Sequence, residues 1–165
     1  MKKLFLLSAL ILTVLTNYSQ TSVASPHETS FGKNITVRYG RPYKKGREIF
    51  GGLERFGAVW RCGADSATTI TFTKNAFFGG KPVKAGTYTL FVIPDKKDWE
   101  IILNSVLGQW GAYDYDKNKN KDILHIKVPV KNLDRVVEQH TIRFTTQNNM
   151  IIEWDRTQVE IPIKI

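Results

Sequence analysis

The sequence predicts an all-β protein: a single antiparallel β-sandwich or jelly-roll-like domain of eight or nine strands, with at most one short helix. Three observations predict it. Apolar and polar residues alternate with a period of two in one run after another. Turn residues separate these runs, and no stretch keeps a helical period for three turns. Short alternating strands with regular turn signals are typical of sandwiches and barrels.

The first 19 residues have the features of an export signal. Lys2 and Lys3 precede a nearly unbroken apolar run over residues 4–15, and small and polar residues follow. This order is the anatomy of a secretory signal peptide, and the run is shorter than the ~20 apolar residues that a membrane-spanning helix needs. We expect cleavage after Ser19, or as late as residue 24, and a soluble protein in the periplasm or outside the cell.

A flexible lead over residues 20–32 and one domain over residues 33–165 are then expected. In the first strand, Ile35, Val37 and Tyr39 share the face that we expect to be buried. Similar alternation occurs at 68–74, 86–94, 99–104, 124–128, 142–144, 150–154 and 159–165. Turn signals lie between these segments, at 79–82, 94–95, 148–149 and 155–156. A short helix near residues 48–55 is disfavoured because Gly51 and Gly52 interrupt it.

Composition limits the partners that the chain can take. The formal net charge of +9 favours anionic molecules such as phosphates, carboxylates and acidic glycans. Export, together with the lack of a basic tail, argues against nucleic acid. Cys62 is the only cysteine, so there is no internal disulfide and no cysteine after the apolar run to carry a lipid. The oligomeric state stays open.

Residues 38–65 contain the densest mixture of basic, aromatic and glycine residues in the chain, and a ligand is expected there. Arginines bind carboxylates or phosphates through paired hydrogen bonds, and a loop tryptophan near tyrosines can stack on a ring. An internal partner (Asp65, Glu54 or Asp114) explains Arg61 as well as a ligand does. The expected ligand-binding residues are Arg41, Arg47, Trp60, Arg61, Trp110 and Tyr113.

Catalytic and metal chemistry find little support. Cys62 is expected to be an inert small hydrophobe, and His140, in phase with Ile142, a semi-buried, hydrogen-bonded histidine. No metal-ligand spacing and no phosphate-binding glycine motif is present, so neither a metal nor a cofactor is expected. The catalytic alternative is speculative: a hydrolase that uses Asp65 with a polarising Arg61.

Several motifs resemble one family of exported proteins, the domain-of-unknown-function family 2911, which is found mainly among Bacteroidetes. They are GRP at 40–42, KGREIFG at 45–51, FGAVWRCGADSATTITF at 56–72, GKPVKAGTYTLFVIP at 80–94, WEIILN at 99–104, QWGAYDYD at 109–116 and IEWDRTQVEIPI at 152–163. The resemblance implies export but no activity. Family members have WRTGAN where this chain has WRCGAD, so Cys62 and Asp65 depart from the pattern.

The leading functional hypothesis is an exported domain that binds an anionic small molecule or an envelope glycan. The hydrolase is one alternative. A structural or partner-binding envelope domain without a small-molecule ligand is the other, and arginines that are dispersed or paired internally would favour it.

Overall fold

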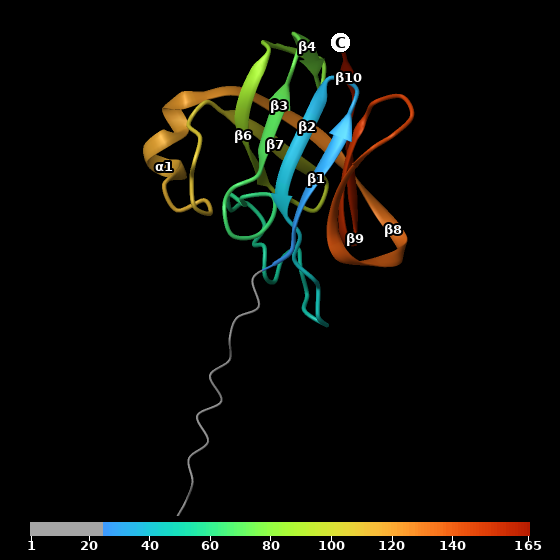
Figure 1. Ribbon diagram of the computed structural model, residues 1–165. Coiled ribbons are helices and arrows are strands. Elements are labelled where there is room, and N and C mark those ends of the chain that lie inside the picture. Colours follow the sequence, from blue (N-terminus) through green and yellow to red (C-terminus); the bar gives the residue numbers. More distant parts are fainter. Residues whose placement is uncertain (1–24) are drawn as a thin grey trace, which may run out of the picture.

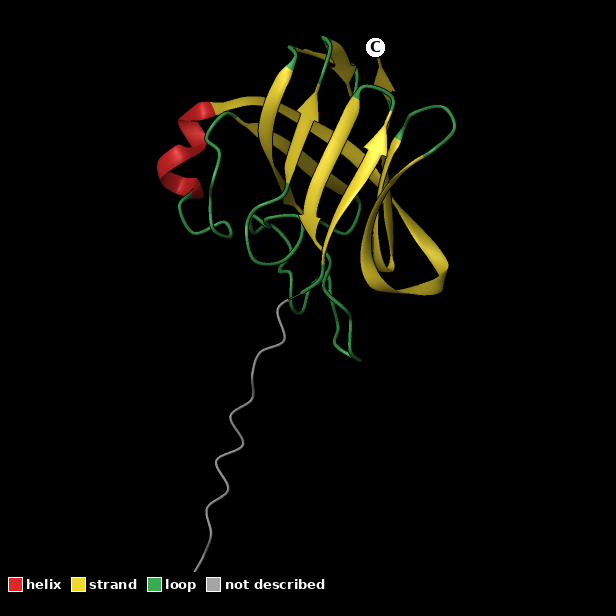
Figure 2. Ribbon diagram, in the orientation of Figure 1, coloured by secondary structure: helices red, strands yellow, loops and turns green. Residues whose placement is uncertain are grey.

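The computed structural model describes residues 25–165, and antiparallel strands dominate it (Figures 1 and 2). The predicted signal peptide and its cleavage sites lie outside the described residues. The strands are β1 (His27–Gly32), β2 (Ile35–Gly40), β3 (Thr69–Phe72), β4 (Ala76–Phe78), β5 (Lys81–Val83), β6 (Gly86–Ile93), β7 (Asp98–Asn104), β8 (Asp122–Phe144), β9 (Met150–Ile161) and β10 (Ile163–Lys164). One short helix, α1 (Tyr115–Asn118), continues into a 3-10 turn at Lys119–Lys121. The all-β class is confirmed, although the helix lies outside residues 48–55.

Two antiparallel sheets form the domain. Seven strands are hydrogen-bonded in the order β1-β2-β3-β6-β7-β8-β9, and a three-stranded sheet has the order β10-β4-β5. The large sheet curls into a nearly closed barrel, and β4 and β10 lie at one end of it (Figure 1). The loops of residues 41–66 lie at the other end, which we call the loop end (Figure 1).

The long strand β8 brings the curled sheet towards closure. Its first part pairs with β7 and its second part with β9, with register shifts between Asn132 and Thr141 where the strand bends. The chain that follows β2 lies against the same part of β8: His140 N donates to the Pro42 carbonyl at 2.9 Å, and Lys44 N donates to the Glu138 carbonyl at 2.7 Å. Backbone hydrogen bonds therefore tie the chain after β2 to the far end of the sheet.

A flexible lead was expected over residues 20–32, and strand β1 corrects this expectation for residues 27–32. Residues 27–32 pair with β2 along their whole length, from His27 opposite Gly40 to Gly32 opposite Ile35. The segment HETSFG has no apolar alternation, and the side chain of Phe31 is 73% exposed. Backbone pairing rather than a buried face holds this edge strand, so hydrophobic periodicity could not reveal it.

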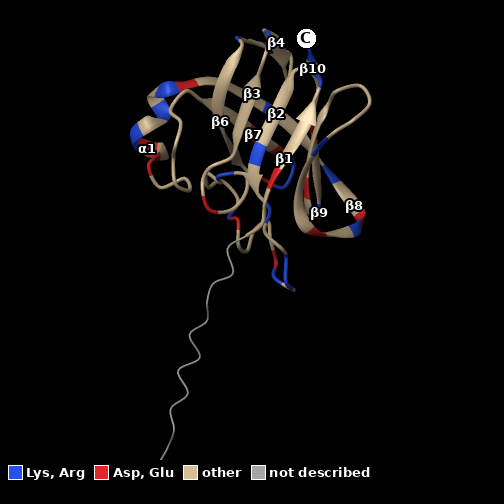
Figure 3. Cartoon of the chain, viewed as in Figure 1, with Lys and Arg blue, Asp and Glu red and all other residues tan. Residues whose placement is uncertain are grey.

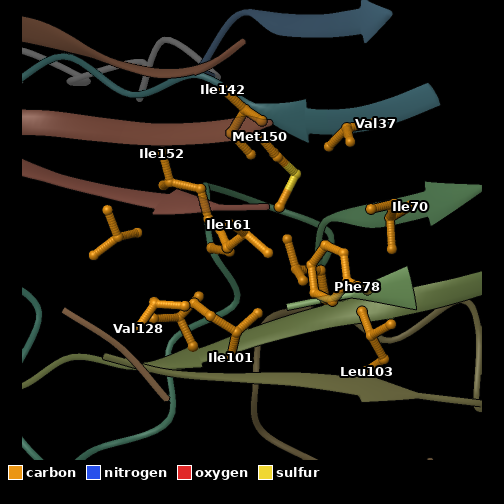
Figure 4. Close-up of a cluster of buried hydrophobic side chains, with 14 of the residues drawn as sticks. Val37, Ile70, Phe78, Ile101, Leu103, Val128, Ile142, Met150, Ile152 and Ile161 are labelled. Carbon is orange, nitrogen blue, oxygen red and sulfur yellow. The ribbon is translucent and has the colours of Figure 1, made fainter. Parts of the chain in front are cut away.

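Most of the core fills the interior of the barrel, and the predicted inward faces are buried there. Ile35, Val37 and Tyr39 of β2 are at most 2% exposed. Towards the end that carries β4 and β10 the core is mostly aliphatic (Figure 4), and its exceptions include Met150 and the Phe72–Phe78 ring pair. Apolar burial of this kind is the main favourable term in folding.

A second apolar cluster covers the outside of the sheet. Phe91 of β6 and Ile102 of β7 point away from the interior but are 0% exposed, because Ala67 and Tyr115 cover them. The Phe91 and Tyr115 rings meet at 5.1 Å between centroids. This cluster holds the segment between β7 and α1 against the sheet and against the chain just before β3.

Aromatic rings occupy the interior near the loop end. Trp60 packs against Trp99 and Trp154, with ring centroids 6.1 Å away in both cases, and against Phe50 at 5.8 Å. His140 lies in the same cluster, 5.0 Å from the Trp60 ring and 5.4 Å from Tyr39. Large aromatic pairs of this kind add stability beyond the area they bury.

His140 was expected to be semi-buried and hydrogen-bonded, but it is fully buried and its ring makes no hydrogen bond within the described residues. Neither ring nitrogen has a partner among residues 25–165. Burial lowers the pKa of His140 to about 3; the nearby Gly40 carbonyl partly opposes this shift, although it is not in hydrogen-bonding geometry, and Arg41 adds to it. Burial in an apolar site disfavours the imidazolium, so the ring is neutral at pH 7.

We predict that His140 makes the fold sensitive to acid. The pKa of His140 in the folded state is below its unfolded value of 6.5, so the unfolded state takes up the proton first and stability falls as the pH drops below about 6.5. At pH 4.5 this one group should cost about 2–3 kcal/mol. Urea unfolding of the wild type and of His140→Phe at pH 7.5 and pH 4.5 measures it. The variant should lose less stability on acidification, and an equal loss would refute the assignment.

We also predict that any side chain at position 40 strongly destabilises the fold. A Cβ at this position would lie 2.2 Å from the Ala64 carbonyl oxygen, because the end of β2 crosses the loop of residues 62–65 in contact with its backbone. Gly40→Ala should reduce the free energy of unfolding by about 3 kcal/mol. Gly80→Ala is the control, since its Cβ would meet nothing and only its positive φ of 82° is unfavourable; it should cost about 1 kcal/mol. Equal losses in urea unfolding would show that the backbone contact yields easily.

Candidate functional site

The loop of residues 61–68 departs from the sheet and returns to it. Trp60 N and Val92 N of β6 each donate to the other's carbonyl, at 2.7 and 2.9 Å, and Thr68 N donates to the Arg61 carbonyl at 3.1 Å. Between these bonds, Cys62 and Asp65 adopt positive φ values of 55° and 62°. Left-handed backbone at residues other than glycine is strained, so packing and hydrogen bonds at both ends fix the shape of this loop.

The segment between β7 and α1 meets this loop. Ala67 N donates to the Gln109 carbonyl at 3.0 Å, and Gly111 N donates to the Asp65 carbonyl at 3.1 Å. These bonds place Trp110 beside Ser66 in an isolated antiparallel bridge. Residues more than 40 positions apart in the sequence therefore form one surface.

Arg61 and Tyr113 are in contact on that surface. The Arg61 guanidinium carbon is 5.8 Å from the centroid of the Tyr113 ring, within the range of a cation–π interaction. Arg61 Nη1 also donates to the Asp65 backbone carbonyl at 3.1 Å. The rings remain available, because Trp110 is 61% and Tyr113 75% exposed. We call Arg61, Asp65, Trp110 and Tyr113 the Arg61 patch.

The Asp65 carboxylate has a histidine neighbour that the sequence could not identify. His27 Nε2 lies 3.2 Å from Asp65 Oδ2, because β1 brings His27 to the loop end of the sheet. The guanidinium of Arg61 contacts the backbone of Asp65 rather than its carboxylate. A carboxylate polarised directly by Arg61, as the hydrolase hypothesis supposes, is not the arrangement described.

Arg41 and Arg47 lie outside the patch and have internal partners. Arg41 Nη1 is 2.8 Å from a Glu28 oxygen, and its Nε donates to the His140 carbonyl at 3.1 Å. Arg47 Nε donates to the Lys44 carbonyl at 2.9 Å. Basic residues are thus spread over several loops at the loop end of the barrel (Figure 3).

Trp60 and Cys62 are part of the interior. Trp60 is 3% exposed, and its indole N–H donates to the Gly63 carbonyl at 3.2 Å. Cys62 is completely buried, and burial raises the pKa of its thiol, so the thiolate is disfavoured. Of the six expected ligand-binding residues, the structure brings Arg61, Trp110 and Tyr113 together at one surface.

A buried carboxylate holds the segment that carries Trp110 and Tyr113. Asp122 Oδ2 accepts from Tyr115 Oη at 2.6 Å and lies 3.1 Å from His125 Nε2, while its Oδ1 accepts from Asn104 Nδ2 at 2.7 Å. These bonds connect α1 to β7 and β8. The pKa of Tyr115 is raised, first by burial of the phenol and then by its hydrogen bond to the Asp122 carboxylate.

The sequence indicated Glu54 as one candidate internal partner of Arg61 but did not predict its burial, and it lies near the patch in an unusual environment. Burial raises the pKa of the Glu54 carboxyl to about 7, against the opposing effect of the Arg61 and Arg47 charges. Backbone hydrogen bonds to Ile49 and Gly51 fix its loop. A polar residue between Leu53 and Arg55 has no sequence signal for burial, since its environment depends on the tertiary packing of the loop.

Other kinds of site find no support in the described part of the chain. Residues 25–165 contain no cluster of three or more histidine, cysteine, aspartate or glutamate side chains that could hold a metal ion. Over the same residues, no helix has the length and apolar character to cross a membrane.

We predict that Glu54→Gln stabilises the protein at alkaline pH. The pKa of Glu54 is higher in the folded state than its ordinary value of 4.5, so its favourable contribution exists below about pH 4.5 and is lost as the pH rises through 7. The variant should gain about 1–2 kcal/mol at pH 8.5, reduced from the full shift because the side chain is partly exposed, and nothing near pH 4.5. Urea unfolding at both pH values tests this, with the exposed Glu48→Gln as control. A gain that does not change with pH would contradict the prediction.

Comparison with known proteins gives one match. A search of curated proteins and a search of solved structures found no similar protein. The sequence model of a family described as protein of unknown function (DUF2911) matches residues 20–163, which is nearly the whole chain. The chain therefore belongs to the DUF2911 family.

Proposed function

We propose that this protein is an exported binding module that holds an acidic glycan at the Arg61 patch. The observation that carries the proposal is the contact of Arg61 with the exposed Tyr113 ring. Backbone hydrogen bonds between the loop of Arg61 and the segment of Tyr113 place the exposed Trp110 ring on the same surface. Exposed aromatic groups that gather on one surface mark interaction sites. The signal-like N-terminus supports export.

The chemistry of the patch suits a sugar acid. Arg61 Nη1 uses one N–H for the Asp65 carbonyl, and the guanidinium has five N–H groups in all. The others can bind a carboxylate through charge-assisted hydrogen bonds. Trp110 and Tyr113 offer flat apolar faces on which the ring of a neighbouring sugar unit can rest.

The exposure of the patch favours a polymer over a small molecule. A small ligand gains affinity by being mostly enclosed in a pocket, whereas the rings of Trp110 and Tyr113 lie open to solvent. Successive units of a chain can contact the two rings and Arg61 together. The charged contact of Arg61 weakens as salt is raised, because screening shortens to about 8 Å at physiological ionic strength.

A partner-binding envelope domain is the second candidate. It is favoured by the internal contacts of Arg41 and Arg47, which remove two of the arginines expected to clamp an anion. In that case Trp110 and Tyr113 would anchor a protein interface, since aromatic residues and arginine are enriched at interface hot spots. The arrangement of Asp65 offers nothing that favours hydrolysis over binding.

We predict that Arg61→Ala and Trp110→Ala each weaken binding of uronic-acid oligosaccharides at least tenfold. Each variant removes one of the two kinds of contact, the charged hydrogen bonds or the stacking surface. Isothermal titration of the purified protein with oligogalacturonate and with a neutral oligosaccharide of equal length measures the loss. Wild-type affinity for the acidic ligand should fall as salt is raised.

The controls are Arg55→Ala and Phe31→Ala, which remove an exposed arginine and an exposed ring away from the patch. Both should bind as the wild type does. If the wild type binds neither acidic nor neutral oligosaccharides at millimolar concentration, or if Arg61→Ala binds as tightly as Arg55→Ala, the glycan proposal is wrong and the partner-binding candidate stands.

A further inference from the structure

A separate pocket opens at the loop end of the barrel. It has a volume of about 290 Å³ and is lined by Phe50, Phe56, Asp95, Lys96, Trp99, Val130, Asn132 and Thr157. We call it the Trp99 pocket. It is formed by the loop after residue 48, the turn between β6 and β7, Trp99 of β7, and the strands β8 and β9, where Asn132 and Thr157 are paired. None of its lining residues belongs to the Arg61 patch.

Backbone hydrogen bonds hold these parts together. Gly57 N donates to the Pro94 carbonyl at 2.9 Å, which ties the first loop to the turn between β6 and β7. Val130 N donates to the Lys97 carbonyl at 2.8 Å, which ties the same turn to β8. The walls are therefore set by main-chain bonds before any ligand arrives, and a preformed pocket binds with less ordering cost.

The inner part of the pocket is aromatic, and one of its lining residues, Trp99, carries a donor that is unpaired among the described residues. Phe50 packs on Trp99 with ring centroids 4.6 Å apart. Trp99 is 0% exposed, and its indole Nε1 has no hydrogen-bond partner within residues 25–165. A buried N–H without a partner is costly and uncommon. An acceptor atom delivered by a ligand would supply the missing bond.

The outer part of the pocket is polar and rich in donors. Lys96 is exposed and its Nζ lies 5.9 Å from the centroid of the Phe56 ring. The Asn132 and Thr157 side chains make no hydrogen bond with another described residue, while Asp95 Oδ1 already accepts from Lys96 N at 2.6 Å. The rim thus offers an ammonium, an amide and a hydroxyl, which suit a carboxylate.

We propose that the Trp99 pocket binds a small aromatic carboxylate that carries a hydrogen-bond acceptor at the end opposite its acid group. The ring lies against Phe50 and Phe56, the carboxylate meets Lys96 at the rim, and the acceptor takes the Trp99 indole N–H. The two polar ends of this ligand correspond to the two ends of the pocket: its acceptor to the buried Trp99 and its carboxylate to the exposed Lys96. This inference does not depend on the proposed glycan function, because the two sites share no residue.

The test compares three ligands that differ at one end. The probes are 4-hydroxyphenylacetate, phenylacetate, which lacks the hydroxyl acceptor, and tyrosol, which replaces the carboxylate by an alcohol. Titrations followed by ¹H–¹⁵N NMR give the affinities and report the four indole N–H signals directly, the number of tryptophans in the chain. We expect 4-hydroxyphenylacetate to bind with about millimolar affinity, roughly threefold to tenfold more tightly than phenylacetate and about fivefold more tightly than tyrosol.

The variants separate the two ends of the ligand. Lys96→Met should bring the affinity for 4-hydroxyphenylacetate to that for tyrosol, while Lys97→Met is the matched control, since Lys97 does not line this pocket. Trp99→Phe identifies the Trp99 indole signal by its loss and should bring the affinity to that for phenylacetate. If Trp99→Phe does not fold, Phe56→Ala, at an exposed ring, replaces it and should weaken binding of all three probes.

The Trp99 indole proton should move downfield with 4-hydroxyphenylacetate and not with phenylacetate. Absence of binding by all three probes at 10 mM (on the order of ten times the expected dissociation constant) would overturn the proposal. Equal effects of Lys96→Met and Lys97→Met, or an unmoved Trp99 signal in the bound protein, would overturn it as well.

Discussion

The burial of Trp60 inside the barrel, near the loop end, is the constraint on which both proposed sites depend. Its backbone pairs with Val92, and its ring lies among Trp99, Trp154 and Phe50. With Trp60 pointing inward, the next residue, Arg61, points to the outside. Trp60 thus helps to fix the aromatic wall behind the Trp99 pocket and the position of Arg61 in the patch.

A second constraint acts on the outside of the sheet. Phe91 and Ile102 lie on the outer face of the sheet, where solvent would contact them if nothing packed on that face. Tyr115 covers them instead. Because Tyr115 is also bound to Asp122, the segment that begins after β7 must return over the sheet. That return brings Trp110 and Tyr113 to Arg61, so the patch is a consequence of apolar burial nearby rather than of attraction between its own members.

The sequence allowed the fold class and the inward faces to be predicted, because alternation is a local property: Ile35, Val37 and Tyr39 are buried as expected. It could not show which arginines have internal partners and which face the candidate site, because the Glu28 and His140 contacts of Arg41 depend on how distant strands pair. It also placed Trp60 among the ligand-binding residues, whereas the ring is buried; no alternating run surrounds Trp60 to indicate that it points inward. Edge strand β1 has no apolar pattern at all, and backbone pairing alone reveals it.

The distribution of unsatisfied polar groups distinguishes the two ends of the barrel. The Trp99 indole and the His140 imidazole are the buried side chains that lack a partner within residues 25–165, and both lie in the aromatic cluster near the loop end. The mostly aliphatic core towards β4 and β10 contains neither (Figure 4). A sequence selected for stability alone has little reason to keep such groups, because apolar residues of similar shape would avoid their desolvation. Trp99 lines the pocket proposed above, so a ligand acceptor there would satisfy its indole N–H, whereas His140 is not among the lining residues and its unpaired ring remains a cost to stability.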